Sequence, residues 1–324
     1  MTDIKFLGEE NFLAIMETKN KAFIKSEVKH QSFTSFDGTR LCCYIASPDS
    51  PKGAVVFLHG FGEFFGKFRE YVWYLFQAGY KVFFLEHRGH GSSEGKLPEH
   101  DVVYIDSFDT YVEDLHMFIE KEVLPASEHL DLLMIAHSMG GCIGTLFLEK
   151  YPDYFKAAIL SSPMFRLRAI NYPPIFCIFA GLYTKLTGKS KNIAPGQPHF
   201  NPYKDFENSS ARSKARFDYQ LAQRREDKNN QTTGASISWA LAAMIAIDKA
   251  IRNATLIHIP VTVMTAGDDH LIDPAGYELF KKYCKSARFH HYENSRHELF
   301  NSDDESRKCY FADVIETLDN YNAG

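Results

Sequence analysis

Short apolar runs alternate with longer amphipathic segments along most of the chain. The apolar runs occupy residues 52–60, 81–89, 130–138 and 155–163. The amphipathic segments between them occupy residues 68–79, 108–123 and 142–152. Apolar runs without alternation are typical of strands that are covered on both faces, and strands that alternate with helices form parallel sheets. The pattern therefore predicts a doubly wound, mostly parallel sheet of the α/β class.

The alternation stops at Pro163 and resumes with an apolar run at 261–269. It then continues as a helix at 275–285, a strand at 288–294 and a last helix at 304–320. The residues between the two halves read as helical and irregular, as expected of a cap inserted into a sheet domain. We expect a core formed by residues 1–164 and 251–324 and a helical cap at 165–250. Ahead of the first buried strand, residues 31–47 predict a hairpin that turns at Asp37-Gly38.

Composition narrows the functional class. The chain has a net charge of −5, with 45% apolar and 24% charged residues, which suits a globular protein and argues against general binding of nucleic acid.

No apolar run reaches the 18 or so residues that a membrane-spanning helix needs. The first residues lack the basic and then apolar pattern of a secretion signal, so we expect a cytosolic protein. The six cysteines are scattered, and we expect all of them to be reduced and structural.

A serine stands where an apolar run meets a predicted helix, in Ala136-His137-Ser138-Met139-Gly140. A serine on such a turn sits in strained backbone with its hydroxyl raised above the sheet, where it can act as a nucleophile. The flanking residues must be small, because strand and helix pass close to the turn. By itself the pentapeptide also fits a plain Ser-x-Gly turn, but its position between strand and helix favours the nucleophile.

Two backbone N–H groups are candidate donors to the oxyanion that would form at this serine. One belongs to Met139 at the start of the helix, and the other to Phe61 in the loop at 58–63 (LHGFGE). The glycines at 60 and 62 allow this loop to turn sharply. His59 could be mistaken for a catalytic base, but we interpret it as a structural residue that braces the loop.

The remaining partners follow the chain order of serine, acid and histidine. Asp268 and Asp269 follow the apolar run at 261–269, and His297 follows the last predicted strand. In this interpretation His297 takes the proton of Ser138 and later returns it to the leaving group. The acid holds the imidazole in one tautomer and stabilises its charged form. Position alone leaves both aspartates open.

Five motifs together resemble the α/β-hydrolase superfamily, in particular its monoacylglycerol lipase and lysophospholipase branch. They are HGFGE (59–63), EHRGHGSSEG (86–95), AHSMGG (136–141), GDDHLID (267–273) and SRHELF (295–300). The resemblance covers about residues 30–320 and implies an α/β-hydrolase fold. It also implies that Asp269 is the triad acid, with Asp268 its neighbour and Asp273 a further acid that closes the loop.

The likeness extends to the bacterial membrane-associated lysophospholipases, through residues 136–152 and the cap segments at 210–223 and 237–243. Two positions depart from the family's pattern. Ala136 replaces the first glycine of the pentapeptide, and Glu86 stands where many members carry aspartate. The loop after Glu86 reads as structural, so the expected chemistry is unaffected.

The cap supplies the argument about substrate. Between Asp153 and Asp205 the chain has no acidic residue. The basic residues of this stretch are Lys156, Arg166, Arg168, Lys185, Lys189, Lys191 and Lys204. Residues 173–183 (PPIFCIFAGLY) are too short to span a bilayer and suit an interfacial segment or a wall for an acyl chain. We predict that Lys185, Lys189 and Lys191 bind a phosphate headgroup or an anionic lipid surface, the alternative being a solvated basic face over a packed helix.

We therefore expect a serine hydrolase that cleaves the acyl ester of a lysophospholipid through a Ser138 acyl-enzyme and needs no metal or organic cofactor. A monoacylglycerol lipase or a carboxylesterase is the alternative within this chemistry. A proline-iminopeptidase-type enzyme would need a cap carboxylate to hold an amine. The available carboxylates are Glu207, Asp218, Glu226 and Asp227. A hydrolase fold kept as a non-enzymatic binding protein would usually have lost a triad residue.

We expect a lipid or small-ester substrate, no nucleic-acid partner, and a cytoplasmic protein that is either free or in peripheral contact with the anionic inner membrane surface. The histidine pairs His87 and His90, and His290 and His291, lack a convincing set of metal ligands. The sequence leaves the headgroup, acyl-chain length, positional preference and oligomeric state open.

Overall fold

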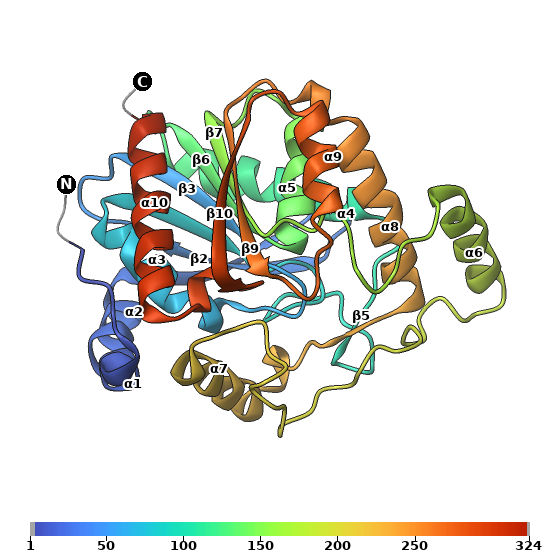
Figure 1. Ribbon diagram of the computed structural model, residues 1–324, viewed down its shortest axis with the longest axis horizontal. Helices are drawn as coiled ribbons and strands as arrows, with labels where there is room; N and C mark the ends of the chain where they lie inside the picture. Colours follow the sequence, from blue (N-terminus) through green and yellow to red (C-terminus); the bar gives the residue numbers. More distant parts are fainter. Residues whose placement is uncertain (1–3, 323–324) are drawn as a thin grey trace.

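An eight-stranded sheet forms the centre of the protein, and helices cover both of its faces (Figure 1). The computed structural model describes residues 4–322. The strand order is β1-β2-β4-β3-β6-β7-β9-β10. Strand β2 runs antiparallel to both of its neighbours, and every other adjacent pair is parallel. The structure thus confirms the prediction of a doubly wound, mostly parallel sheet.

The strands of this sheet are β1 (Val28–Thr34), β2 (Arg40–Ala46), β3 (Gly53–Leu58), β4 (Tyr80–Leu85), β6 (Leu132–His137), β7 (Ala157–Ser161), β9 (Val261–Asp268) and β10 (Ala287–Arg296). Two short strands, β5 (Val102–Val103) and β8 (Gly234–Ala235), form a separate parallel pair. The expected hairpin is formed by β1 and β2, and Gly38 in its turn has a φ of +88° that favours glycine.

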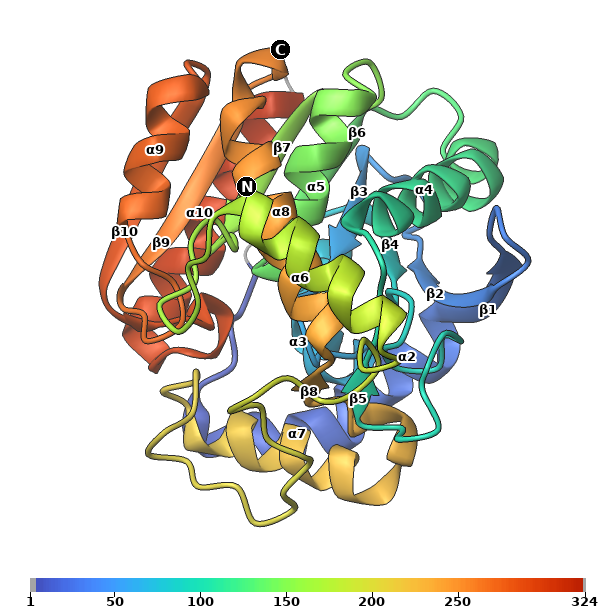
Figure 2. The ribbon, with the colours of Figure 1, turned by 90° about the vertical axis from the view of Figure 1, so that its right-hand side faces the viewer.

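The helices are α1 (Phe12–Ile15), α2 (Lys21–Glu27), α3 (Arg69–Gln77), α4 (Phe108–Phe118), α5 (Met139–Lys150), α6 (Pro174–Leu186), α7 (Lys214–Glu226), α8 (Ile237–Arg252), α9 (Ala275–Tyr283) and α10 (Asp304–Asn322). Helices α3 and α10 cover one face of the sheet, and α4, α5, α8 and α9 cover the other (Figures 1 and 2).

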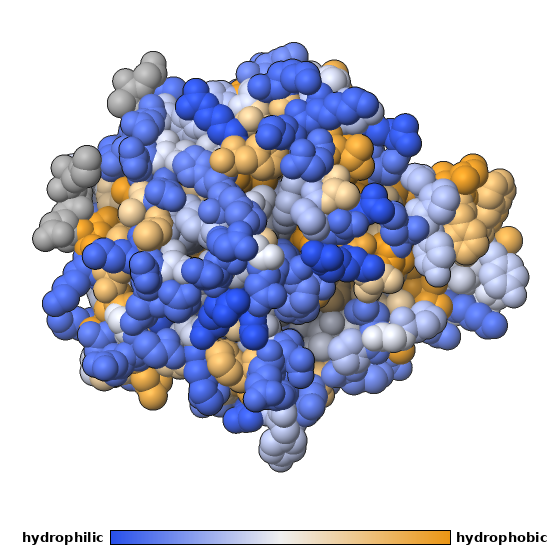
Figure 3. Space-filling model, in the orientation of Figure 1, coloured by the Kyte–Doolittle hydropathy of each residue, from blue (hydrophilic) through white to orange (hydrophobic). Residues whose placement is uncertain are grey.

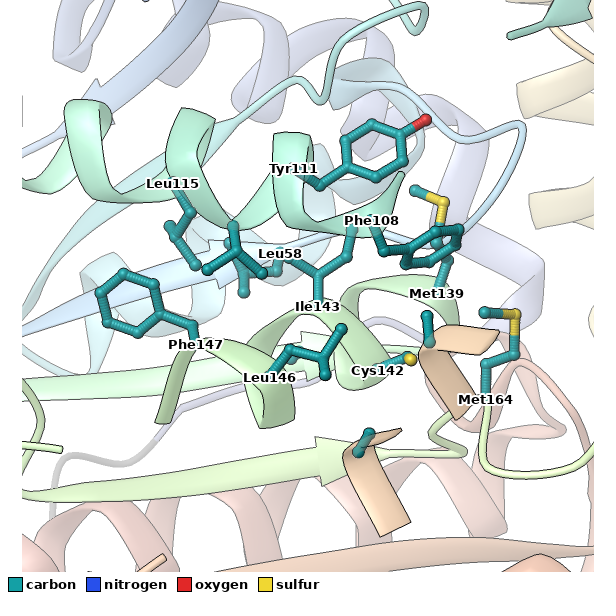
Figure 4. Close-up of a cluster of buried hydrophobic side chains, with 14 of the residues drawn as sticks. Leu58, Phe108, Tyr111, Leu115, Met139, Cys142, Ile143, Leu146, Phe147 and Met164 are labelled. Atoms are coloured by element: carbon teal, nitrogen blue, oxygen red, sulfur yellow. The ribbon is translucent and has the colours of Figure 1, made fainter. Parts of the chain in front are cut away.

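Large apolar side chains fill the space between the sheet and its helices. On the face covered by α4 and α5, Phe108 and Leu115 of α4 meet Ile143 and Phe147 of α5 over Leu58 of β3 (Figure 4). All five side chains are buried. The six cysteines are free thiols, and five of them are buried. This packing fixes α5 against the sheet, and the first turn of α5 lies beside Ser138.

The segment expected to form a cap, residues 165–250, has three parts that pack differently. Helix α8 packs within the main core through Trp239, Ala243 and Ile247. Helix α7 lies across the carboxyl edge of the parallel strands, whereas α6 stands off at the side of the molecule (Figures 1 and 2). The cap boundaries at 165 and 250 stay a prediction. Among residues 4–322, no helix is long and apolar enough to cross a bilayer.

Candidate active site

Ser138 occupies a strained turn between β6 and α5. Its backbone has φ +50° and ψ −115°, a conformation that non-glycine residues rarely adopt. A Cβ on Gly140 would lie 2.4 Å from the carbonyl oxygen of Leu58, and one on Gly141 would lie 2.6 Å from Cβ of Pro163. The small residues after the serine are therefore required, because the helix starts almost in contact with the neighbouring backbone.

The structure brings Ser138, His297 and Asp269 together at the carboxyl edge of the sheet. The Ser138 hydroxyl donates to Nε2 of His297 over 2.8 Å. Nδ1–H of His297 donates to Oδ2 of Asp269 over 2.7 Å. Oδ1 of Asp269 accepts the backbone N–H groups of Leu271 at 2.9 Å and Ile272 at 3.0 Å. Four hydrogen bonds thus hold Ser138, the imidazole of His297 and the carboxylate of Asp269 in place.

Electrostatics separate His297 from the histidines around it. Burial lowers the pKa of His59, His137 and His270 below the ordinary value. Burial also disfavours the charged form of His297, but the carboxylate of Asp269 outweighs it and raises the pKa. Burial opposes ionisation of Asp269 too, yet His297 and the two backbone N–H groups lower its pKa. This pair is therefore suited to accept a proton at Nε2.

The two aspartates that the sequence leaves open have different surroundings. Asp268 is 56% exposed and forms ion pairs with Arg212 at 3.0 Å and Arg296 at 3.5 Å. Within residues 4–322 it forms no hydrogen bond or ion pair with the imidazole, whereas Asp269 accepts a hydrogen bond from Nδ1–H. Asp273 accepts the N–H of Ala275 at 3.0 Å and pairs with Arg166 at 2.8 Å, so it stabilises the start of α9.

The two N–H groups expected to bind an oxyanion are free in this structure. Within residues 4–322, neither Phe61 N–H nor Met139 N–H donates to another protein atom. The loop of Phe61 is held close to the serine, since a Cβ on Gly60 would lie 3.0 Å from Cβ of Ser138. His59 braces this loop: Nδ1 donates to the Gly60 carbonyl over 2.7 Å, and Nε2 accepts the N–H of His87 over 3.0 Å.

A buried ion cluster, which the sequence did not reveal, lies behind the same loop. The Lys67 ammonium lies 2.7 Å from Glu63 and 2.7 Å from Glu298. The other oxygen of Glu63 accepts the Gly60 N–H, and the other oxygen of Glu298 accepts the Asn301 amide at 2.8 Å. Burial opposes the charge on Glu298, but Lys67 lowers its pKa to about 2. The cluster connects the loop of Phe61 to Glu298, the residue that follows His297. Both oxygens of Glu63 and both oxygens of Glu298 have a partner within the protein.

A pocket of about 270 Å³ opens beside Ser138 between the sheet edge and α7. Its apolar lining consists of Phe61, Phe64, Pro198, Phe217, Leu221 and Leu271. Its charged lining consists of Glu63, Lys67, Lys204, Arg224 and Glu298. Lys204 belongs to the acid-free stretch of the sequence, but Arg224 does not, and no sequence pattern marks either as facing the serine.

The three lysines predicted to bind substrate lie outside this pocket. Lys185 is 65% exposed on α6 and pairs with Asp106 at 3.4 Å. Lys191 places its ammonium 5.5 Å from the ring centre of Tyr104, and Lys189 is exposed just after α6. Other members of the acid-free stretch are bound elsewhere, as Lys156 pairs with Asp131 at 2.8 Å. The seven basic residues therefore do not gather on one surface, because the fold distributes them among several elements.

Among residues 4–322, no group of three or more His, Cys, Asp and Glu side chains is placed to hold a metal ion. The arrangement of Ser138, His297 and Asp269 with two free N–H groups supports nucleophilic catalysis of acyl transfer. Ser138 can attack a carbonyl carbon as His297 takes its proton, and the N–H groups can stabilise the oxyanion that forms. Return of the proton to the leaving group then yields an acyl-enzyme that water can hydrolyse.

Comparison with known proteins agrees with this chemistry. The pattern of the family described as "Serine aminopeptidase, S33" matches residues 49–304. A monoacylglycerol lipase of Mycolicibacterium smegmatis is 28% identical over 286 residues, covering 86% of this chain and 93% of the relative. Lysophospholipase L2 of Escherichia coli is 24% identical over 287 residues, covering 83% of this chain and 81% of the relative.

Solved structures agree on the fold. A carboxyl esterase from Bacillus coagulans, solved with glycerol, has a TM-score of 0.75 at 20% identity and covers 91% of this chain and 99% of its own. A soluble variant of monoglyceride lipase from Saccharomyces cerevisiae, solved with a substrate analogue, has a TM-score of 0.73 at 23% identity. It covers 91% of this chain and 96% of its own. Both structures share the fold of this chain, a sheet with flanking helices.

Proposed function

Since this ester-hydrolysing chain belongs to the serine aminopeptidase S33 family and has the α/β-hydrolase fold, we propose that it releases the fatty acid of a lysophospholipid. Ser138 is the nucleophile, His297 the general base and acid, and Asp269 the residue that orients and stabilises His297. Phe61 and Met139 supply the oxyanion-binding N–H groups. The acyl-enzyme on Ser138 is the intermediate.

One observation carries the choice of substrate: the pocket beside Ser138 has apolar walls and more cationic than anionic side chains. The apolar side chains suit an acyl chain, because each buried CH₂ group contributes about 0.8 kcal/mol to binding. Three cationic side chains line the pocket against two carboxylates. Both carboxylates are bound by Lys67. An anionic headgroup is favoured in such a pocket over a neutral glycerol.

The same observation disfavours the aminopeptidase activity in the family's description. A substrate amine needs a free carboxylate in the pocket. Of the cap acids, Asp218 binds Lys214, Asp227 caps a short turn through the Asn229 N–H, and Glu207 and Glu226 are exposed. None of these four lines the pocket.

The test measures release of palmitate from 1-palmitoyl lysophosphatidylglycerol, 1-palmitoyl lysophosphatidylcholine and 1-palmitoylglycerol side by side. We expect wild type to prefer the two phosphate-bearing lipids and Ser138→Ala to lose at least 10³-fold in rate. Hydrolysis of the glycerol ester alone would instead assign a monoacylglycerol lipase, the second candidate, which the relative from Mycolicibacterium smegmatis favours. Release of an amino acid from a peptide amide but from none of the lipids would refute both assignments.

We also propose that α6 docks on the surface of an anionic membrane. Of the side chains of α6, Cys177 is buried, while Phe179 is 65%, Leu182 56% and Leu186 79% exposed. The space-filling view shows apolar residues gathered over α6, at the edge of a mostly hydrophilic face (Figure 3). Lys185, Lys189 and Lys191 lie at the carboxyl end of this helix, where each can contribute about 1 kcal/mol near an anionic surface.

Vesicle co-sedimentation tests this docking. We expect wild type to bind vesicles that contain phosphatidylglycerol, and Phe179→Ser to bind at least tenfold more weakly, because an inserted aromatic side chain contributes about 2 kcal/mol. Leu13→Ser is the matched control, since Leu13 is 57% exposed on α1, away from α6. Equal binding of wild type and Phe179→Ser would refute the docking without affecting the assignment of the active site.

A further inference from the structure

Two cations in the pocket beside Ser138 have no carboxylate partner. Among residues 4–322, neither Lys204 nor Arg224 forms an ion pair, although both line the pocket. Within the described residues, three buried cations are paired: Lys67 binds two glutamates, and Arg216 and Arg307 bind Glu70. A buried charge without a counter-charge is unfavourable unless a ligand supplies one.

The guanidinium of Arg224 is held in a fixed orientation. Its Nε donates to the carbonyl of Asn230 over 2.8 Å. Its Nη2 donates to the carbonyl of Thr232 and, over 2.8 Å, to the hydroxyl of Thr233. Nη1 has no protein partner within residues 4–322. Burial lowers the pKa of Arg224 to about 10, against the opposing effect of Glu298 and Glu63. The side chain therefore stays charged at neutral pH and keeps N–H donors free.

Lys204 completes the pair from a separate loop. The loop is shaped by the N–H groups of Tyr203 and Lys204, which donate to the side chain and carbonyl of Asn201. The residue as a whole is exposed, but protein surrounds its ammonium and lowers its pKa. Glu298 opposes this shift, whereas Arg224 and Lys67 add to it. Lys204 and Arg224 line the same pocket as Ser138. An anion bound there would be attracted by both charges.

The wall that carries Arg224 is rigidly attached to the core. On α7, Arg216 donates to both oxygens of Glu70 over 2.8 Å, and Arg307 of α10 donates to the same carboxylate over 2.6 Å. The Arg216 and Arg307 side chains are 2% and 1% exposed. Because this network is buried, α7 holds Arg224 in place before any substrate arrives. A preorganised donor loses little entropy on binding.

We propose that Lys204 and Arg224 form a phosphate subsite, which holds the phosphate of the substrate's headgroup while its acyl ester lies at Ser138. This proposal rests on the proposed function and gives that function its substrate class. Arginine suits phosphate because its planar donors match the phosphate oxygens, and lysine adds a compact positive charge. The subsite therefore selects a glycerophosphate ester over glycerol.

The test uses the intact protein with Lys204→Gln, Lys204→Arg and the control Lys228→Gln. Lys228 is exposed, lies close to Arg224 in the sequence and does not line the pocket. For 1-palmitoyl lysophosphatidylglycerol we expect Lys204→Gln to lower kcat/KM about tenfold, mainly through KM, and Lys204→Arg to restore most of it. For 1-palmitoylglycerol we expect less than a twofold change. Equal losses on both substrates, or no loss on either, would overturn the subsite.

A second assay keeps this proposal separate from the proposed function. It measures inhibition of p-nitrophenyl butyrate hydrolysis by sn-glycerol 3-phosphate, by inorganic phosphate and by glycerol. We expect sn-glycerol 3-phosphate to inhibit wild type most strongly, and about tenfold less strongly after Lys204→Gln. Equal inhibition by inorganic phosphate, with the same dependence on Lys204, would overturn the headgroup assignment in favour of a free phosphate. If wild type cleaves no lysophospholipid, the proposed function fails, and this assay still decides whether the subsite exists.

Discussion

Replacing Asp269 with asparagine tests the active site most sharply, because the structure dictates how the new side chain must sit. Oδ1 of Asp269 accepts two backbone N–H groups, from Leu271 and Ile272. In Asp269→Asn the amide oxygen will keep these two bonds, so the amide NH₂ group will face Nδ1 of His297. The imidazole must then carry its proton on Nε2, where it can no longer accept one from Ser138. We expect kcat to fall about 10⁴-fold, equivalent to about 5 kcal/mol of transition-state stabilisation.

Asp268→Asn is the matched control for this substitution. Asp268 is the adjacent residue, and its partners are the surface arginines Arg212 and Arg296. We expect its kcat for p-nitrophenyl butyrate to stay within about threefold of wild type, since exposed ion pairs contribute little. Circular dichroism and thermal unfolding of both variants establish that they are folded. A tenfold or smaller loss for Asp269→Asn, or a larger loss for Asp268→Asn, would refute the roles assigned to these aspartates.

Three further predictions concern the pH dependence of activity, a half-buried glutamate and the glycine beside the serine turn. The kcat/KM of wild type should decline as pH falls through the raised pKa of His297. In Asp269→Asn the carboxylate that raises this pKa is gone, so the acidic limb of the pH profile should move to lower pH. An unmoved limb would contradict the role of His297 as the base. Burial raises the pKa of Glu149 from 4.5 to about 9. The folded state therefore holds a proton that the unfolded state releases, and the stability of wild type declines as pH rises through this range. Urea unfolding should find Glu149→Gln about 3 kcal/mol more stable than wild type at pH 7 but not at pH 4, and an equal gain at both pH values would contradict this prediction. Gly140→Ala should destabilise the protein by about 1–3 kcal/mol and abolish activity, because its Cβ would lie 2.4 Å from the Leu58 carbonyl oxygen. Gly181→Ala on α6 is the control: it has open space around it, so its thermal unfolding temperature should equal or exceed that of wild type.

The sheet and the serine turn could be predicted because their signals are local. Uninterrupted apolar runs report strands buried on both faces, and the small residues after Ser138 report a helix that starts against Leu58. The order of the partners along the chain located His297 as well. Choosing Asp269 over Asp268 needed a family resemblance, because adjacent aspartates differ only in which way their side chains point.

The pocket could not be predicted from the sequence, because its charged lining comes from four separate segments. Lys67 lies before α3, Lys204 in a loop, Arg224 on α7 and Glu298 after β10. The acid-free stretch indicated basic character, but it did not say which lysines would face the serine. Lys204 lines the pocket that contains the serine, whereas Lys185, Lys189 and Lys191 lie outside it. Whether a lysine is neutralised depends on which acidic side chains of other elements lie beside it. These contacts form only in the folded chain, so the sequence does not show them.

Helix α8 shows a similar limit. Its residues continue the helical character of the preceding segment, so the sequence places them in the predicted cap. In the structure Trp239 and Ala243 pack in the same core cluster as α5. A buried face on a helix is evident in the sequence, but which surface covers that face is not. For α6 the sequence leaves an interfacial segment, a wall for an acyl chain and a packed helix open, and the structure leaves most of its large apolar side chains exposed.

We expect a lysophospholipid to acylate Ser138, and rapid acid quenching followed by peptide mass spectrometry would detect this acyl-enzyme. Wild type mixed with 1-palmitoyl lysophosphatidylglycerol should carry a palmitoyl group on the peptide that contains Ser138, within the first turnover. The same peptide from Ser138→Ala should stay unmodified, and that variant should release palmitate at least 10³-fold more slowly. Palmitate release by wild type without acylation of this peptide, or undiminished release by Ser138→Ala, would show that Ser138 is not the nucleophile.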